Sequence, residues 1–249
     1  MLKGYPLGTI QELPAGGMSA RPAPEFNRRL PLADQVLDDL RSRILSLELP
    51  PNTALSRNEL SDFYGISQTP LRDALLKLES DRLLRIFPQS RTLVSPLNLN
   101  DIRETQFLRN AIEKEIAGLL ASQHVGCEIL AAEDTISSME RLAAQPEMDL
   151  AAFNRADKTY HAALFAAAGK SGLFDMIEAR SGNLNRVRHL HLRFREDAKP
   201  ARVIEDHRSI LVAIVEGDAG RARAAIRSHL SHTLDRLEEL NKKFPDLFD

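Results

Sequence analysis

The stretch "SRNELSDFYGISQTPLRDALLKLESDRLL", residues 56–84, decides the fold, because its apolar residues recur at helical spacing on both sides of a tight turn. Ser56 is placed to cap the first helix, and Glu59, three residues later, completes a capping box. Gly65 suits the end of that helix, since glycine readily adopts the left-handed conformation that closes many helices. The stretch therefore predicts two short helices joined by the turn "GIS".

The segments on either side extend this pattern. Residues 32–47, "LADQVLDDLRSRILSL", have the apolar spacing of another helix, which Pro50 and Pro51 end. Residues 83–96, "LLRIFPQSRTLVSP", hold enough β-branched and apolar residues for two short strands around a polar tip. Three helices followed by a β-hairpin form a winged helix-turn-helix, which we place at residues 30–97.

The remainder of the chain is expected to be helical except at its start. Residues 1–29 show little periodicity and predict a flexible N-terminal arm that contributes little to the core. Short loops between helices imply an antiparallel all-helical bundle over residues 98–243, so the expected fold class is mainly α. The bundle is predicted to contain six helices, near residues 99–122, 127–144, 149–168, 172–196, 201–216 and 219–242.

Composition limits the class of protein. A chain of 249 residues, 43% of them hydrophobic, can bury two cores. Cys127 is the only cysteine, which excludes an intrachain disulfide and fits a reducing cytoplasm. No apolar run reaches the roughly 18 to 20 residues that span a bilayer, so we expect a cytoplasmic protein without a membrane partner. The formal charge of −2 gives no overall sign of nucleic-acid binding, so a basic surface has to be local.

The second helix of a helix-turn-helix places its N-terminal end in the major groove of DNA. Four polar side chains lie at that end here: Ser67, Gln68, Thr69 and Arg72. Glutamine can pair with adenine and arginine with guanine. Arg57, before the turn, and Arg91, at the wing tip, are placed for phosphates. Residues 31–95 hold 8 Lys and Arg against 9 Asp and Glu, so the charge of this segment does not by itself indicate DNA binding. The alternative is that the polar residues named above are solvated ends of a small helical domain.

Two histidines flank a predicted helical hairpin. The turn "EGDAG", residues 216–220, separates the last two predicted helices. His207 lies ten residues before Gly217, and His229 lies nine residues after Gly220. At ~1.5 Å per residue, both lie about 14 to 15 Å from the turn. The two side chains should therefore stand at the same height and can face each other.

A third predicted helix carries Asp157 and His161, four residues apart and thus on one face. Such a pair is common on a solvated helix, and that remains the alternative. With His207 and His229, however, it would bring one carboxylate and three imidazoles into the bundle, where helical proteins build metal sites. This set suits Zn²⁺, Ni²⁺, Mn²⁺ or Fe²⁺ and leaves room for an anion, so we predict a divalent metal site.

A further group of basic residues occupies the helix predicted near residues 172–196. Arg186, His189 and Arg193 share one face of that helix and could bind an anionic effector. The alternative is a solvated basic face.

The sequence between Ala33 and Pro96 resembles the N-terminal domain of the GntR family of bacterial transcription regulators, and "GISQTPLRDAL" is its most specific piece. The resemblance implies double-stranded operator DNA as the partner, with contacts from Arg57, Ser67, Gln68, Thr69, Arg72, Ser90 and Arg91. Arginine is usual in this family at the position of Gln68, which puts the guanine contact there in doubt and suggests an altered operator. Glycine is usual at the positions of Arg82 and Arg91, so the backbone shape there is expected to differ.

The C-terminal part resembles the all-helical FCD effector domain of the FadR-like branch of that family, in its shorter VanR-like variety. The matching pieces are "FLRNAIEKEIAGLLA", "DKTYHAALFAAAG" and "EDHRSILVAIVEGDAGRARAAIRSHL". The resemblance implies that Asp157, His161, His207 and His229 bind the divalent metal. It also implies that Arg109 helps to hold an acidic effector beside that metal.

The function expected from these features is that of a ligand-responsive transcription regulator, more specifically a repressor, and not of an enzyme. A homodimer would bind a palindromic operator, because one helix-turn-helix contacts only a few base pairs. A small carboxylate would bind near the metal and change DNA binding. Two alternatives stay open: a metal-dependent hydrolase or lyase with an accessory DNA-binding domain, and a regulator whose metal is purely structural.

Overall fold

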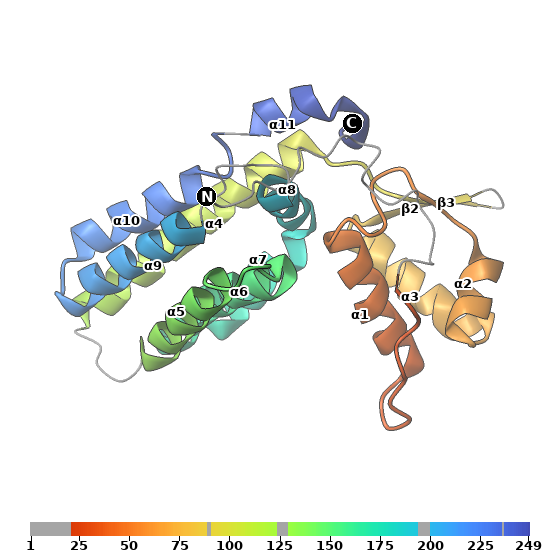
Figure 1. Ribbon diagram of the computed structural model, residues 1–249, viewed down its shortest axis with the longest axis horizontal. Helices are drawn as coiled ribbons and strands as arrows, with labels where there is room; N and C mark the ends of the chain where they lie inside the picture. Colours follow the sequence, from red (N-terminus) through yellow and green to blue (C-terminus); the bar gives the residue numbers. More distant parts are fainter. Residues whose placement is uncertain (1–20, 89–90, 124–128, 194–199, 236) are drawn as a thin grey trace. The chain divides into compact units, whose positions relative to one another are not determined.

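The structure is a computed structural model that describes residues 21–88, 91–123, 129–193, 200–235 and 237–249 (Figure 1). It is mainly helical, as predicted. Two compact units are present, and each draws on separate segments of the chain. The first comprises Met1–Leu99, Gly182–Leu190 and Glu239–Asp249, and the second comprises Asn100–Ser181 and His191–Glu238. Among the described residues, no helix has both the length and the apolar character needed to cross a membrane.

Three helices form the frame of the first unit: α1 (Leu32–Leu45), α2 (Arg57–Tyr64) and α3 (Gln68–Ser80). The Ser56 hydroxyl accepts a hydrogen bond from the Glu59 backbone N–H, as the capping box predicted. Gly65 ends α2 in the left-handed conformation, with φ of 61°. The apolar faces of the three helices meet in one core with Leu83, Leu84 and Val94.

A small antiparallel sheet completes the winged helix-turn-helix. The predicted hairpin consists of β2 (Leu84–Phe87) and β3 (Arg91–Val94), with Ile86 opposite Thr92. A third strand, β1 (Ala54–Leu55), pairs with the other edge of β3 and gives the order β1-β3-β2. This strand was not predicted, because two residues are too few to show an alternating pattern.

The described end of the predicted N-terminal arm contributes to the core of the first unit, contrary to expectation. Ala23 and Phe26 pack against this core, and the Phe26 ring lies 5.9 Å from that of Tyr64. The fully buried guanidinium of Arg43 also takes the backbone oxygen of Pro22 as an acceptor. A buried cation requires such partners, and the sequence pattern did not show which segment supplies them. Residues 1–20 of the arm lie outside the described residues.

The chain beyond the wing is helical: α4 (Leu99–Ser122), α5 (Leu130–Ala143), α6 (Leu150–Ala167), α7 (Ser171–Arg180), α8 (Gly182–Arg193), α9 (Pro200–Val215), α10 (Ala219–Ser231) and α11 (Leu237–Lys243), followed by the short 3-10 helix η3 (Pro245–Leu247). Most of α8 and α11 and all of η3 belong to the first unit, and the other helices form the second. Helices α9 and α10 form the predicted hairpin and lie side by side (Figure 1). Helix α5 packs against α6 and α9. One apolar core is formed by residues of α4, α5, α6, α7, α9 and α10.

The prediction of six helices beyond residue 98 was wrong, since the described residues contain eight. The helix predicted near 172–196 is broken at Ser181, between α7 and α8. A Cβ on Gly182 would lie 2.8 Å from Leu83 Cδ2, so this break accompanies a close tertiary approach in which a larger residue would displace the Leu83 side chain. The helix predicted at 219–242 is interrupted between α10 and α11, and Leu237 and Leu240 of α11 are buried.

Candidate functional site

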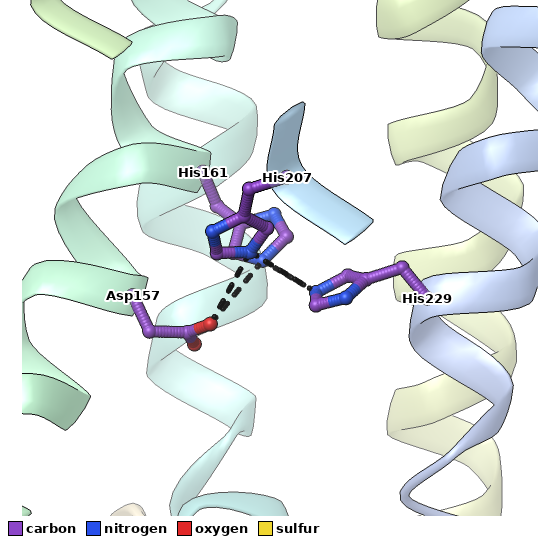
Figure 2. Close-up of side chains that lie close together, drawn as sticks. All are labelled: Asp157, His161, His207 and His229. Carbon is purple, nitrogen blue, oxygen red and sulfur yellow. Dashed lines mark hydrogen bonds and ion pairs between the residues drawn. The ribbon is translucent and has the colours of Figure 1, made fainter. Parts of the chain in front are cut away.

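The four predicted metal ligands come together inside the second unit (Figure 2). Asp157 and His161 project from α6, His207 from α9 and His229 from α10, and all four are buried. One ligand atom from each lies within 4.8 Å of the others. His207 Nε2 is 3.4 Å from Asp157 Oδ1, and His229 Nε2 is 3.3 Å from Nε2 of both His207 and His161. We call these four residues the ligand cluster.

The turn between α9 and α10 explains why the two distant histidines meet. Gly217 adopts a φ of 74° after the end of α9, and the Asp218 carboxylate caps α10 by accepting from the Arg221 backbone N–H. Two helices joined by such a turn run antiparallel. Residues that lie equally far from the turn, one on each helix, are therefore side by side. The predicted convergence of His207 and His229 is therefore present; metal binding by the cluster remains a prediction.

Three residues that the sequence did not predict hold the histidine rings in place. The Glu113 carboxylate lies 2.7 Å from His161 Nδ1, and the Asp206 carboxylate lies 3.3 Å from His229 Nδ1. Tyr160 stacks on the His207 ring, with centroids 3.8 Å apart, and its hydroxyl donates to the His207 backbone oxygen. Carboxylates and stacked rings behind histidine ligands fix the orientation of the imidazoles in metal sites.

Glu113 is held as a carboxylate by its surroundings. Burial by itself would raise its pKa, but the positive charge of Arg109 and the contact with His161 more than offset burial, so the pKa of Glu113 lies well below its usual range. Arg109 is also buried, and its Nε donates to Glu113 Oε1 over 2.7 Å. A carboxylate can only accept, so the tautomer of His161 that suits this contact carries its proton on Nδ1 and turns the Nε2 lone pair toward the cluster.

The donor atoms of the ligand cluster fit a divalent cation. His161 and His229 both turn Nδ1 toward a carboxylate, so two neutral imidazoles would place unprotonated Nε2 atoms 3.3 Å apart. Such lone pairs repel unless a cation lies between them. Two donors bound to one ion at about 2.1 Å lie roughly 3.0 to 3.5 Å apart at neighbouring positions, which agrees with the shortest distances in the cluster.

Arg109 has hydrogen-bonding capacity beyond its pair with Glu113. Within the described residues, its guanidinium makes no hydrogen bond other than the one from Nε. A guanidinium carries five N–H donors and binds carboxylates with two parallel bonds. Its outer nitrogens can therefore receive an acid.

The structure does not add the predicted basic face of α8 to this site. The Arg186 guanidinium is buried and donates to the backbone oxygens of Ser95 and Pro96 and to Asn183 Oδ1, all within the first unit. The Arg186 guanidinium thus holds the segment that follows β3, and these contacts do not support the predicted role in effector binding. His189 is half-buried on the same stretch of α8, and the side chain of Arg193 lies outside the described residues.

The predicted DNA-contacting residues lie on the surface of the first unit. Six of them are described and exposed: Arg57, Ser67, Gln68, Thr69, Arg72 and Arg91. Ser67 is the N-cap of α3, and its side chain makes no capping hydrogen bond. Arg57 and Arg91 line one groove of about 510 Å³ beside the wing. The remaining predicted residue, Ser90, lies outside the described residues.

The GntR resemblance predicts a different backbone shape at Arg82 and Arg91, and of these two positions only Arg82 has an unusual conformation. Arg82, where the GntR resemblance led us to expect a different shape, adopts the left-handed conformation, with φ of 58°. The chain therefore follows a glycine-like path with an arginine, against the steric preference of an L side chain. Arg91 begins β3, and its guanidinium lies 5.3 Å from the centre of the Phe87 ring.

Sequence signals for the supporting residues exist but are weak. Glu113 lies four residues after Arg109 on the predicted first helix of the bundle, which indicates only a shared face. Asp206 and Tyr160 each directly precede a cluster histidine along the chain. Which of these side chains would contact a histidine depends on the packing of α4, α6, α9 and α10, which spacing along one helix does not give.

Comparison with known proteins agrees with both units. Residues 32–94 match the family model described as bacterial regulatory proteins, gntR family, and residues 104–232 match the FCD domain. An uncharacterised HTH-type transcriptional regulator of Streptomyces ambofaciens is 33% identical over 84% of this chain and 86% of its own length. The transcriptional repressor RspR of Escherichia coli is 25% identical over 90% of this chain and 96% of its own.

Solved structures show the same fold. Escherichia coli McbR/YncC has a TM-score of 0.69 at 21% identity, covering 84% of this chain and 98% of its own. A putative GntR regulator from Rhodococcus sp. RHA1 has a TM-score of 0.68 at 20% identity, covering 83% and 97%. The chain is a DNA-binding transcription regulator of the GntR family with a C-terminal FCD domain.

Proposed function

We propose that this regulator is a cytoplasmic repressor whose DNA affinity is controlled by a small carboxylate that binds beside a divalent metal in the FCD domain. The observation that carries the proposal is the ligand cluster: three imidazoles and one carboxylate, buried and converging, with charged Glu113 and Asp206 behind two of the rings. Burying polar side chains is unfavourable unless they are paired or hold an ion, so the alternative of a solvated polar pair does not explain this buried arrangement.

Asp157, His161, His207 and His229 would hold the metal, and their donor types suit Zn²⁺, Ni²⁺, Mn²⁺ or Fe²⁺. A metal bound there supplies a Lewis-acidic position for a carboxylate oxygen. Glu113 and Asp206 keep two of the imidazoles oriented with Nε2 toward that position.

Arg109 would bind the carboxylate of the effector. It is buried beside Glu113, and its charge also acts on Asp157, which places it close to the ligand cluster. The Glu113 carboxylate fixes the Nε edge of the guanidinium, so the other nitrogens are oriented before the acid arrives. Such preorganisation lowers the entropic cost of binding.

The first unit would bind a palindromic operator as part of a homodimer. Gln68 and Arg72 are exposed at the start of α3, where they can contact base edges, while Arg57, Ser67, Thr69, Ser90 and Arg91 are assigned to phosphates or neighbouring bases. A repressor is favoured because two relatives at 25% identity, RspR and GlaR of Escherichia coli, carry that name.

The course of the chain offers a route for control. Helix α4 carries Arg109 and Glu113 and follows directly on the first unit. Helix α10 carries His229, and the chain after it returns to the first unit as Glu239–Asp249. An acid that fixes α4 and α10 would bias the first unit only if its affinity differs between the DNA-binding and the released state.

A screen of small carboxylic acids tests this function. Metal-loaded protein is melted in the presence of each acid, and acids that raise the melting temperature are then tested for release of operator DNA in a gel-shift assay. We expect at least one acid to do both. If metal removal lowers the melting temperature but no acid alters operator binding, the metal is structural and the proposal is wrong. Chemical turnover of an acid would instead support the alternative of a hydrolase or lyase.

A further inference from the structure

An aromatic ring and a cation face each other at the outer end of the wing. Phe87, the last residue of β2, and Arg91, the first residue of β3, are direct partners in the antiparallel register. The Arg91 guanidinium lies 5.3 Å from the centre of the Phe87 ring. This distance falls within the roughly 6 Å of a cation–π interaction, so the ring holds the cation at a defined place on the hairpin.

The pair contributes its ring and its charge to the surface of the first unit. Phe87 is 41% exposed although it is a large apolar residue. Arg91 is exposed as well, and within the described part of the chain it forms no ion pair with an acidic side chain. The charge of Arg91 is therefore ordered by an aromatic neighbour and is not neutralised by a carboxylate.

The pair also borders the groove of about 510 Å³ beside the wing. Besides Phe87, the lining of this groove includes Arg57, Arg91, Asn58 and Thr92, with Glu59 as its acidic residue. Two cations and uncharged polar groups beside an apolar ring suit the phosphates and sugars of a DNA strand. The structure thus provides open space for a nucleic-acid backbone directly next to the guanidinium of Arg91.

A guanidinium distinguishes the two kinds of base pair in the minor groove. A·T pairs present only acceptors there, whereas G·C pairs add the amino group of guanine, which is a donor. Arginine only donates, so it can bond to the floor of an A·T-rich groove and opposes the guanine amino group. A-tracts also have a narrow minor groove with enhanced negative potential, which attracts arginine.

We infer that Phe87 is a positioning residue that holds Arg91 for insertion into the minor groove, and that the pair makes this regulator prefer A·T base pairs under its wing. The inference rests on the operator binding proposed above and specifies what Arg91 contacts there. Phe87 covers one face of the guanidinium and leaves its N–H edge for the bases. A phosphate contact alone would not depend on the base pair, since phosphates carry no sequence information.

Replacement of base pairs in the operator tests where Arg91 binds. Half-sites selected by the full-length protein from a random pool are synthesised with A·T, G·C or inosine·cytosine pairs in the flanks. Inosine lacks the amino group of guanine, so its pair with cytosine resembles A·T in the minor groove and G·C in the major groove. We expect G·C flanks to weaken binding about fivefold or more, and inosine·cytosine flanks to bind like A·T. Equal binding of all three operators, or inosine·cytosine as weak as G·C, would overturn the inference.

Protein variants test whether Phe87 acts through Arg91. Phe87→Leu should lower affinity for the A·T-flanked operator about two- to fivefold, the factor that an exposed cation–π contact supplies, and Phe87→Tyr, which keeps the ring, should bind like the wild type. Arg91→Ala should bind A·T and G·C flanks alike, and adding Phe87→Leu to it should change nothing further. Equal losses from Phe87→Leu with and without Arg91, or equal losses in Phe87→Leu and Phe87→Tyr, would contradict the positioning role.

The titrations separate this inference from the proposed function. They are made without any acid, so effector control does not enter the result. Arg72→Ala is titrated in parallel on the A·T-flanked operator. If Arg72→Ala loses binding while the flanks have no effect, operator binding through α3 stands and the inference about Phe87 and Arg91 is wrong.

Discussion

Arg82 shows how a single residue can hold a backbone shape that its side chain disfavours. Its φ of 58° lies in the left-handed region, directly after α3 and its C-cap Asp81. The neighbouring backbone bonds require this path: Arg82 N–H donates to Glu79 O, and Leu83 N–H donates to Leu78 O. These bonds close α3 as the left-handed residue of a helix end usually does.

Arg82→Gly is therefore expected to stabilise the first unit. Left-handed backbone costs an L residue about 1 to 2 kcal/mol, and the greater freedom of glycine in the unfolded chain cancels part of the gain. We predict a net increase of about 0.5 to 1 kcal/mol in the free energy of unfolding, measured by denaturant titration. Arg72→Gly, within α3, is the control and should lose about 1 kcal/mol. A loss of stability in Arg82→Gly would contradict this account.

Glu113 is the residue on which the orientation of His161 depends. Removing its charge leaves the imidazole without a fixed tautomer, although the ring itself stays buried. Glu113→Gln should weaken metal binding by about 10- to 100-fold, as measured by competition with a chelator of known affinity. Glu115→Gln, an exposed change on the same helix, should leave metal affinity unchanged. Equal affinities in the two variants would show that Glu113 does not support the site.

At the scale of elements, α3 carries the contacts proposed for DNA bases. Arg72→Ala should reduce specific operator binding by about 1 to 3 kcal/mol while the protein stays folded, because the side chain is exposed and removes no core contact. Gel-shift titration measures the effect, with Arg227→Ala on the exposed face of α10 as the control.

In the same assay, Gln68→Arg should shift the operators selected from a random pool toward guanine. An unchanged selection would count against this role for Gln68.

The segment after α11 acts as an element of the first unit. Leu97 N–H donates to Leu247 O, Asp249 N–H donates to Leu97 O, and the Asp249 carboxylate pairs with Arg85 of β2. Phe244 and Leu247 are buried. The segment thus adds backbone pairing and apolar contacts to the wing and to the chain that follows it.

Leu247→Ala is expected to destabilise the protein through this segment. A buried leucine replaced by alanine typically costs 2 to 5 kcal/mol, and the short segment can relax, so we predict a loss of about 2 kcal/mol. Thermal or denaturant unfolding measures it, with the exposed Asp246→Ala as the control. If Leu247→Ala unfolds like the control, the segment does not contribute to the stability of the unit.

The elements that sequence could predict are those fixed by local rules. The N-cap bond at Ser56, the left-handed Gly65 and the hairpin between α9 and α10 all follow from contacts within a few residues, and each is present. The break at Ser181 could not be predicted, because it accompanies the approach of Gly182 to Leu83, about a hundred positions earlier. The same limit hid Glu113, whose contact with His161 depends on how α4 packs against α6.

At the scale of the whole molecule, the chain passes repeatedly between the two units. It crosses at Leu99, at Ser181, within α8 and within α11. The helices that hold Arg109 and His229 are each continuous with, or close to, one of these crossings. The effector binding proposed for the FCD domain would therefore have a covalent path along the chain to the DNA-binding unit.

The measurement that tests the central claim most directly is operator binding by fluorescence anisotropy. It compares metal-loaded wild-type protein with the double variant His207→Ala/His229→Ala. Each is titrated with the acid that best stabilises the wild type. Metal content is determined on the same samples. We predict that the wild type retains about one divalent ion per chain and releases the operator as acid is added. The double variant should retain no ion and stay bound to DNA. Release of the operator from the double variant at wild-type acid concentrations would contradict control through the ligand cluster.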